Sequence, residues 1–150
     1  MPMDTEGWVE FSNYSTIEER EEEYAWRHFM DISSVVETFD ENAEILFGYS
    51  KRILRGEFEI EAIAKDRGFP LHCSSAVEAD IKELKEFEEK YGKGEIFGHT
   101  TIYYSEITAV KHLFNAPESD WIKLFKLIEK FKEVKRIQDN QIRLVVWFNW

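Results

Sequence analysis

Cysteine, proline and glycine are all scarce in this sequence of 150 residues, which contains one, three and seven of them respectively. A single cysteine excludes an internal disulfide and a zinc site built from several thiolates. No stretch is rich in serine, glycine or proline, and no segment repeats at a fixed period. We therefore find no linker, and we expect a single domain over residues 1–150.

Basic residues are also in short supply. The chain has 19 Lys and Arg against 30 Asp and Glu, for a formal net charge of −11. This excess of acid argues against general nucleic-acid binding and against an anionic membrane, because both interactions depend on Lys and Arg neutralising phosphates. No apolar run approaches the roughly 20 residues of a membrane-spanning helix, and the N-terminal residues lack a signal-peptide pattern. We expect a cytoplasmic location.

Aromatic residues, by contrast, are abundant, with 5 Trp, 6 Tyr and 12 Phe to supply a core. The spacing of the apolar residues predicts an α+β fold, in which a small, mainly antiparallel sheet including the N- and C-terminal strands packs with several helices. The predicted extended segments are 7–14, one near residue 58, one near residue 102, and 142–150. The last of these is continuously apolar, which favours the middle of the sheet, beside the first strand.

The predicted helices follow apolar residues that recur at intervals of three or four. Capping boxes of the form S-x-x-E, at Ser15 and Ser75, indicate two helix starts. The second helix carries an apolar stripe from Val77 to Tyr91 and ends at Gly92. The other predictions are two helices between residues 24 and 54, with Asn42 near the start of the second, a helix over 105–114, and a helix from 117–120 to 134.

Two H-x-[ST] triplets provide the sharpest enzymatic pattern, His72-Cys73-Ser74 and His99-Thr100-Thr101. Two-histidine phosphoesterases use such triplets to place a general acid and a general base at a phosphodiester. Those enzymes carry one triplet in each of two similar lobes, whereas here the triplets lie close together. We assign no catalytic residue on this basis. The histidines also lack metal-site spacing, so neither a metal nor a cofactor is expected.

Charge is uneven along the chain. Acidic residues gather in the first 23 residues and over 78–89, whereas 123–136 hold six Lys or Arg and two Glu. Both patterns are typical of solvated helix faces. Two functional interpretations remain open beside this one. The acidic surface is compatible with mimicry of nucleic acid toward a DNA-binding protein, and the basic segment is compatible with capture of a small anion.

Three segments together resemble a family of small uncharacterised bacteriophage proteins. Arg67-Gly68-Phe69-Pro70 with Ser74 and Val77 is similar to the family's R-G-L-P-x-x-[VI]-S-x-x-[VI], Gly98-His99-Thr100 with Glu106-Ile107 is similar to G-H-S…L-T-L-x-E-L, and 142–149 is similar to V-R-[IV]-V-F-W-F-D. The start of the helix at Asn42 resembles R-N-Y-D-L-F, although Glu41 and Ala43 replace Arg and Tyr. His72 stands where the family has an acidic residue.

The resemblance implies a phage origin and an infected bacterial host, and it carries no established activity. Because small phage proteins are frequently directed at host enzymes or immune signals, our first hypothesis is a counter-defence protein that sequesters a small anionic, nucleotide-type host immune signal without turnover. The alternatives are an acidic inhibitor of a host defence or DNA-binding protein, and a phosphodiesterase using His99. A homo-oligomer is left open. Candidate ligand-binding residues lie on the matched segments, near turns or strand ends: Asn42, Arg67, Ser74, His99, Thr100 and Arg143.

Overall fold

Four antiparallel strands form the centre of the protein, in the order β2-β1-β4-β3. The computed structural model describes residues 4–37, 41–49, 62–92 and 94–149. The strands are β1 (Asp4–Phe11), β2 (Arg27–Asp31), β3 (Ile96–Tyr103) and β4 (Ile142–Asn149). The terminal strand β4 lies between β1 and β3 and is buried along almost its whole length. The predicted central position of this apolar strand, beside the first strand, is confirmed.

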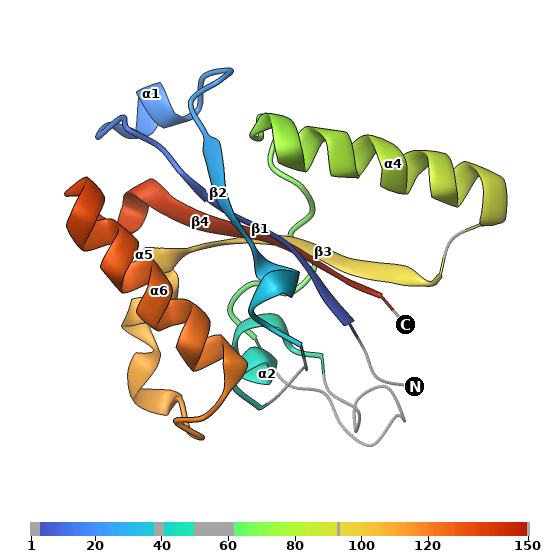
Figure 1. Ribbon diagram of the computed structural model, residues 1–150. Coiled ribbons are helices and arrows are strands. Elements are labelled where there is room, and N and C mark those ends of the chain that lie inside the picture. The colour runs from blue at the N-terminus through green and yellow to red at the C-terminus, as the bar shows by residue number, and fades with distance from the viewer. Residues whose placement is uncertain (1–3, 38–40, 50–61, 93, 150) are drawn as a thin grey trace.

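Helices cover both faces of the sheet (Figure 1). The long helix α4 (Ser75–Tyr91) lies on one face, and the other face is covered by α2 (Glu41–Phe47), α5 (Tyr104–Ala109) and α6 (Asp120–Lys135). A short helix, α1 (Ile17–Arg20), lies in the connection between β1 and β2. The predicted α+β class is therefore confirmed, with the N- and C-terminal strands side by side in an antiparallel sheet.

The larger core lies between the sheet and α2, α5 and α6. The stripe predicted for residues 121–134 supplies Trp121, Leu124 and Ile128, all of which are fully buried. Ser119 begins this helix because its side-chain oxygen accepts a hydrogen bond from the Trp121 amide. On the strand side, Phe148 packs on this core, so the helix is fixed by the match of one apolar stripe to one apolar strand face.

A smaller core lies under α4, where Val77 packs with Val145 and Trp147 of β4. The apolar stripe of α4 continues past this contact. Its last aromatic residues, Phe87 and Tyr91, are 36% and 65% exposed. The C-terminal half of α4 therefore extends beyond the part of the sheet that it covers closely, and a hollow remains beneath it.

The first helix predicted between residues 24 and 54 is wrong, because residues 27–31 form β2 and a 3-10 turn follows over Ile32–Ser34. The side chains of β2 alternate between the two faces of the sheet, as strand geometry requires. Phe29 stacks on Phe131 in the main core, while His28 meets the Trp8 ring on the α4 face. The spacing of the apolar residues in this segment also fits a helix, but hydrogen bonding to β1 makes it a strand.

Several boundaries also differ from the prediction. The helix caps are Thr16, one residue after the expected Ser15, and Ser74, one residue before the expected Ser75. The helix expected over 105–114 is shorter, because α5 ends at Ala109 and only a 3-10 turn, η2 (Lys111–Leu113), follows. The predicted strand near residue 58 and the end of the predicted helix toward Ile53 lie outside the described residues.

Candidate functional site

Two of the six predicted ligand-binding residues, Ser74 and Arg143, meet at a buried carboxylate on the α4 face of the sheet. Glu10 is fully buried, and its two oxygens accept hydrogen bonds from Arg143 Nε at 2.7 Å and from the Ser74 amide at 2.6 Å. Arg143 also donates to the His72 carbonyl oxygen at 2.6 Å and lies 4.0 Å from the Trp26 ring centroid. This network joins β1, β4 and the start of α4.

Arg67 and Thr100 form a second group beside β3. The Arg67 guanidinium makes two parallel hydrogen bonds, of 2.8 and 2.7 Å, to the carboxylate of Glu106. These bonds hold the pKa of Glu106 below its usual value. Thr100 is fully buried, and its hydroxyl donates to the Ala64 carbonyl oxygen and accepts from the Arg67 amide. The group ties the segment after residue 62 to β3 and α5.

Asn42 belongs to neither group. Its buried side-chain amide donates to the Asn115 carbonyl oxygen at 2.7 Å, and its oxygen accepts from the Asn115 backbone amide at 2.9 Å. This reciprocal pair fastens the start of α2 to the loop that precedes α6.

The His99 side chain, although next to Thr100 in β3, has different neighbours and lies in a hollow of about 310 Å³ that Phe69, Lys85 and Glu88 help to line. The Phe69 ring meets the imidazole edge-on, with 4.7 Å between the ring centroids. Burial lowers the pKa of His99, which favours the neutral imidazole. The described lining of this hollow contains no second histidine. The six predicted residues therefore do not line one pocket.

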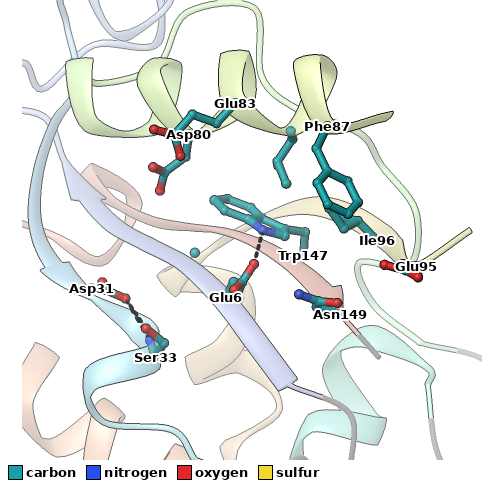
Figure 2. A pocket seen from close by; sticks show the side chains of 12 residues that line it. Glu6, Asp31, Ser33, Asp80, Glu83, Phe87, Glu95, Ile96, Trp147 and Asn149 are labelled. Atoms are coloured by element: carbon teal, nitrogen blue, oxygen red, sulfur yellow. Dashed lines mark hydrogen bonds between the residues drawn. The ribbon is translucent and has the colours of Figure 1, made fainter. Parts of the chain in front are cut away.

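A different cleft, of about 350 Å³, opens between α4 and the sheet (Figure 2). It occupies the hollow beneath the far half of α4. Residues of β1, β4 and α4 form its walls. Its lining consists of Glu6, Gly7, Asp31, Ser33, Asp80, Glu83, Leu84, Phe87, Glu95, Ile96, Trp147 and Asn149. We call it the acidic cleft, because five of these twelve residues are Asp or Glu and none is Lys or Arg.

Three of the cleft carboxylates are held by neutral donors. Glu6 accepts a hydrogen bond from the Trp147 indole at 2.8 Å, and Asp80 accepts one from the Trp8 indole at 2.7 Å. Asp31 accepts two bonds from Ser33, its backbone amide and its hydroxyl, of 2.9 and 2.7 Å. These donors fix the positions of the carboxylates without cancelling their negative charge.

The other two carboxylates, Glu83 and Glu95, are exposed at the edge of the cleft. Neither they nor the three inner carboxylates form an ion pair with any Lys or Arg of the described ranges. Several uncompensated negative charges along low-dielectric walls focus the electrostatic potential inside a cleft. The cleft therefore attracts cations and repels phosphates and carboxylates.

The floor of the acidic cleft is aromatic. Figure 2 shows the Trp147 indole between α4 and Glu6, and Trp147 is only 3% exposed. Phe87 stands above it on α4 and is 36% exposed. Flat aromatic faces beside carboxylates suit a cation that carries an apolar stem, because the ring binds the cation and the stem packs on carbon. Arginine and lysine side chains have this chemistry.

Gly7 allows β1 to pass close to β4 at the cleft. Its φ of +142° lies in the region that favours glycine, and a Cβ at this position would lie 2.0 Å from the Val145 carbonyl oxygen.

The acidic cleft was not among the sites predicted from the sequence. One signal for it was present, because Glu6, Trp8 and Glu10 alternate along β1 and so place polar groups on the inward α4 face.

Within the described ranges, no group of three or more His, Cys, Asp and Glu side chains is arranged to hold a metal ion. The same part of the chain has no helix with the length and apolar character needed to cross a lipid bilayer. Comparisons with protein-family models, with curated proteins and with solved structures find no match.

Proposed function

We propose that this chain is a binding protein, without catalytic turnover, whose acidic cleft receives an arginine or lysine side chain of a protein partner. The observation that supports this proposal is the set of five carboxylates, none ion-paired within the described residues, around the aromatic floor formed by Trp147. A guanidinium matches two carboxylate oxygens through parallel hydrogen bonds, and its planar face stacks on an exposed aromatic ring, which in this cleft is Phe87. This is the acidic inhibitor among the hypotheses drawn from the sequence.

The partner that we propose is a host protein that binds nucleic acid, including a defence protein of that kind. Such proteins present clustered Lys and Arg to phosphates, and an acidic surface competes for those same side chains. The exposed run Glu21-Glu22-Glu23 adds negative charge elsewhere on the molecule. The phage resemblance is the reason for proposing a host target, and the cleft is the reason for proposing a basic one.

Sequestration of a nucleotide-type anion has less support from the described residues. The acidic cleft repels phosphate, and the two arginines proposed for that role already have partners, Arg67 with Glu106 and Arg143 with Glu10. Phosphodiester cleavage by His99 has less support again, because the described lining of the hollow around its imidazole contains no second histidine to act as the partner acid or base. Both hypotheses remain predictions that a ligand panel can test.

A cationic peptide tests the proposed function directly. We would titrate the full chain with a nine-residue arginine peptide near physiological salt and follow the heat and the Trp fluorescence. The cleft variant is Glu83→Gln with Glu95→Gln, which removes two charges without breaking any hydrogen bond found for those side chains. The matched control is Glu21→Gln with Glu22→Gln, an equal charge change at exposed sites away from the cleft.

We expect the cleft variant to bind the peptide about tenfold more weakly, a loss of about 1.4 kcal/mol, and the control to differ from wild type by less than about twofold because salt screens distant charges. Equal weakening in both variants would mean that the peptide responds only to net charge, and it would overturn the cleft proposal. Heat from a cyclic or linear signalling nucleotide, with none from the peptide, would support anion sequestration instead.

A further inference from the structure

A second hollow lies on the other side of the sheet from the acidic cleft, between α6 and the segment that runs from α5 through η2. Its volume is about 700 Å³, within the range of about 300–1,000 Å³ typical of small-molecule sites. We call it the apolar groove. It is lined by Tyr104, Ile107, Thr108, Lys111, Phe114, Asn115, Ala116, Pro117, Ile122, Phe125, Lys126 and Glu129.

The inner wall of the apolar groove is hydrophobic and well packed. Ile107 and Phe125 are 1% and 7% exposed, so the main core supports them from behind. The Phe114 ring stacks on Phe125, with centroids 5.4 Å apart and planes inclined by 26°. Ile122 completes the α6 side. A wall of this kind offers carbon surface to an acyl chain or an aromatic ring, and offers few groups to a fully polar ligand.

The rim of the apolar groove is positively charged. Lys111 on η2 and Lys126 on α6 are both exposed, and neither forms an ion pair with another described residue. The acidic residue of the lining, Glu129, is already bonded to Lys132 at 2.9 Å. Other lysines of α6 have partners too, as Lys123 pairs with Asp120. Two ammonium groups that have no ion-pair partner among the described residues thus stand over an apolar wall.

We infer that the apolar groove binds an amphipathic carboxylate, with an acyl or aryl body against Ile107, Phe114 and Phe125 and its carboxylate between Lys111 and Lys126. The charge complementarity selects the head group, and the carbon wall selects the body. A neutral alcohol of the same length packs on the carbon wall but has no charge for the two lysines to bind, and a cationic amphiphile is repelled by them. The site is independent of the acidic cleft, which lies across the sheet.

Three amphiphiles with the same ten-carbon chain separate the contribution of the head group to binding from that of the chain. They are decanoate, decanol and decyltrimethylammonium, each kept below its micelle concentration. Calorimetry with the full chain should give the tightest binding for decanoate, with decanol about tenfold weaker and the cationic amphiphile weaker still. Octanoate should bind about tenfold more weakly than decanoate, since each buried CH₂ contributes about fourfold at most. A cationic amphiphile that binds as tightly as decanoate would overturn the assignment.

Two lysine variants test the rim. Lys111→Gln with Lys126→Gln should lower the decanoate affinity about tenfold, to the level of decanol, and should leave decanol binding unchanged. The control is Lys123→Gln with Lys130→Gln, the same change in charge on α6 but outside the groove, and it should alter decanoate binding by less than about twofold. Equal effects of the two pairs on decanoate would refute a rim-specific site.

A groove-filling variant tests the wall. Ile122→Trp places a larger side chain in the groove and should abolish binding of both decanoate and decanol. Leu127→Trp, at an exposed position of the same helix outside the groove, should leave binding as in wild type. Circular dichroism checks that each variant folds, and if Ile122→Trp does not, the lysine pairs alone decide. Unchanged decanoate binding in a folded Ile122→Trp protein would overturn the proposal.

Discussion

The buried pair of Glu10 and Arg143 gives the largest stability effect that we expect from a single side chain. Arg143→Met removes the hydrogen bond to Glu10, the bond to the His72 carbonyl and the contact with the Trp26 ring, while keeping much of the side-chain volume. Glu10 is fully buried and its other oxygen accepts a hydrogen bond from the Ser74 amide, so within the described residues its charge is left without a cationic partner. Removing one member of a buried ion pair costs about 3–5 kcal/mol.

The double variant Glu10→Met/Arg143→Met separates the value of the pair from the cost of leaving one charge alone. It removes both charges, so the remaining penalties are the lost Arg143 contacts with the His72 carbonyl and the Trp26 ring and the Ser74 amide without an acceptor, the last of these about 1–3 kcal/mol. We therefore expect the double variant to be more stable than Arg143→Met, although it carries one more substitution. Arg143→Lys, which keeps the charge but loses the planar contact with Trp26, should fall between wild type and Arg143→Met.

Urea unfolding followed by circular dichroism and Trp fluorescence measures these differences, provided that the two signals change together as two-state unfolding requires. Lys130→Met is the control, because Lys130 is exposed and its contact with Glu133 is 3.8 Å long. That variant should unfold close to wild type, as exposed pairs contribute little. If the double variant is no more stable than Arg143→Met, or if Arg143→Met unfolds like wild type, the reasoning from burial is refuted.

Three further predictions concern single sites. The hydrogen bonds from Arg67 lower the pKa of Glu106 below 4.5, so they stabilise the fold above about pH 4.5, and this contribution is lost as the pH falls through the lowered value. In Glu106→Gln the urea midpoint should therefore depend less on pH over that range than in wild type. An unchanged pH dependence would contradict this. Burial raises the pKa of Cys73 to about 12, so a thiol reagent at about pH 8 should label the unfolded chain and spare the native one, whereas rapid native labelling would count against a buried thiol. Gly7→Ala should lower the free energy of unfolding, measured in urea, more than Gly68→Ala does. Both glycines have a positive φ, but of the two only Gly7 would place a Cβ 2.0 Å from a backbone atom. Equal losses of stability would mean that φ alone matters.

The sequence predicts those elements whose pattern agrees with their tertiary partners. The continuous apolar run of β4 leads to its central position, and the Trp121 stripe leads to α6, because each pattern has one way to be buried. β2 escaped prediction because Phe29 and Ile32 also fit helical spacing. Only the neighbouring strand β1 decides between the two conformations, and that neighbour is not part of the local pattern.

The candidate site was harder to predict, for a different reason. From the motifs we predicted that polar residues near turns, among them Arg67 and Arg143, bind a ligand. Their counter-ions, Glu106 and Glu10, are 39 and 133 positions away in the sequence, and only the folded chain places them within hydrogen-bonding distance. A charged residue near a turn therefore predicts an interaction well, but it does not tell whether the partner is a ligand or the protein itself.

The same distinction between internal partners and ligands limits what can be inferred from the phage resemblance. Its three main segments, 67–77, 98–107 and 142–149, contain Arg67, Ser74 and Arg143, whose polar groups join the segments to each other and to β1. The five carboxylates of the acidic cleft, Glu6, Asp31, Asp80, Glu83 and Glu95, all lie outside those segments. The resemblance thus includes Trp147 and Asn149 of the cleft lining but none of its five carboxylates, so it gives no reason to expect the acidic charge of this cleft in the phage proteins. The basic protein partner that we propose therefore rests on the carboxylates of this chain's own cleft, and the phage resemblance adds only the proposal that the partner belongs to a host.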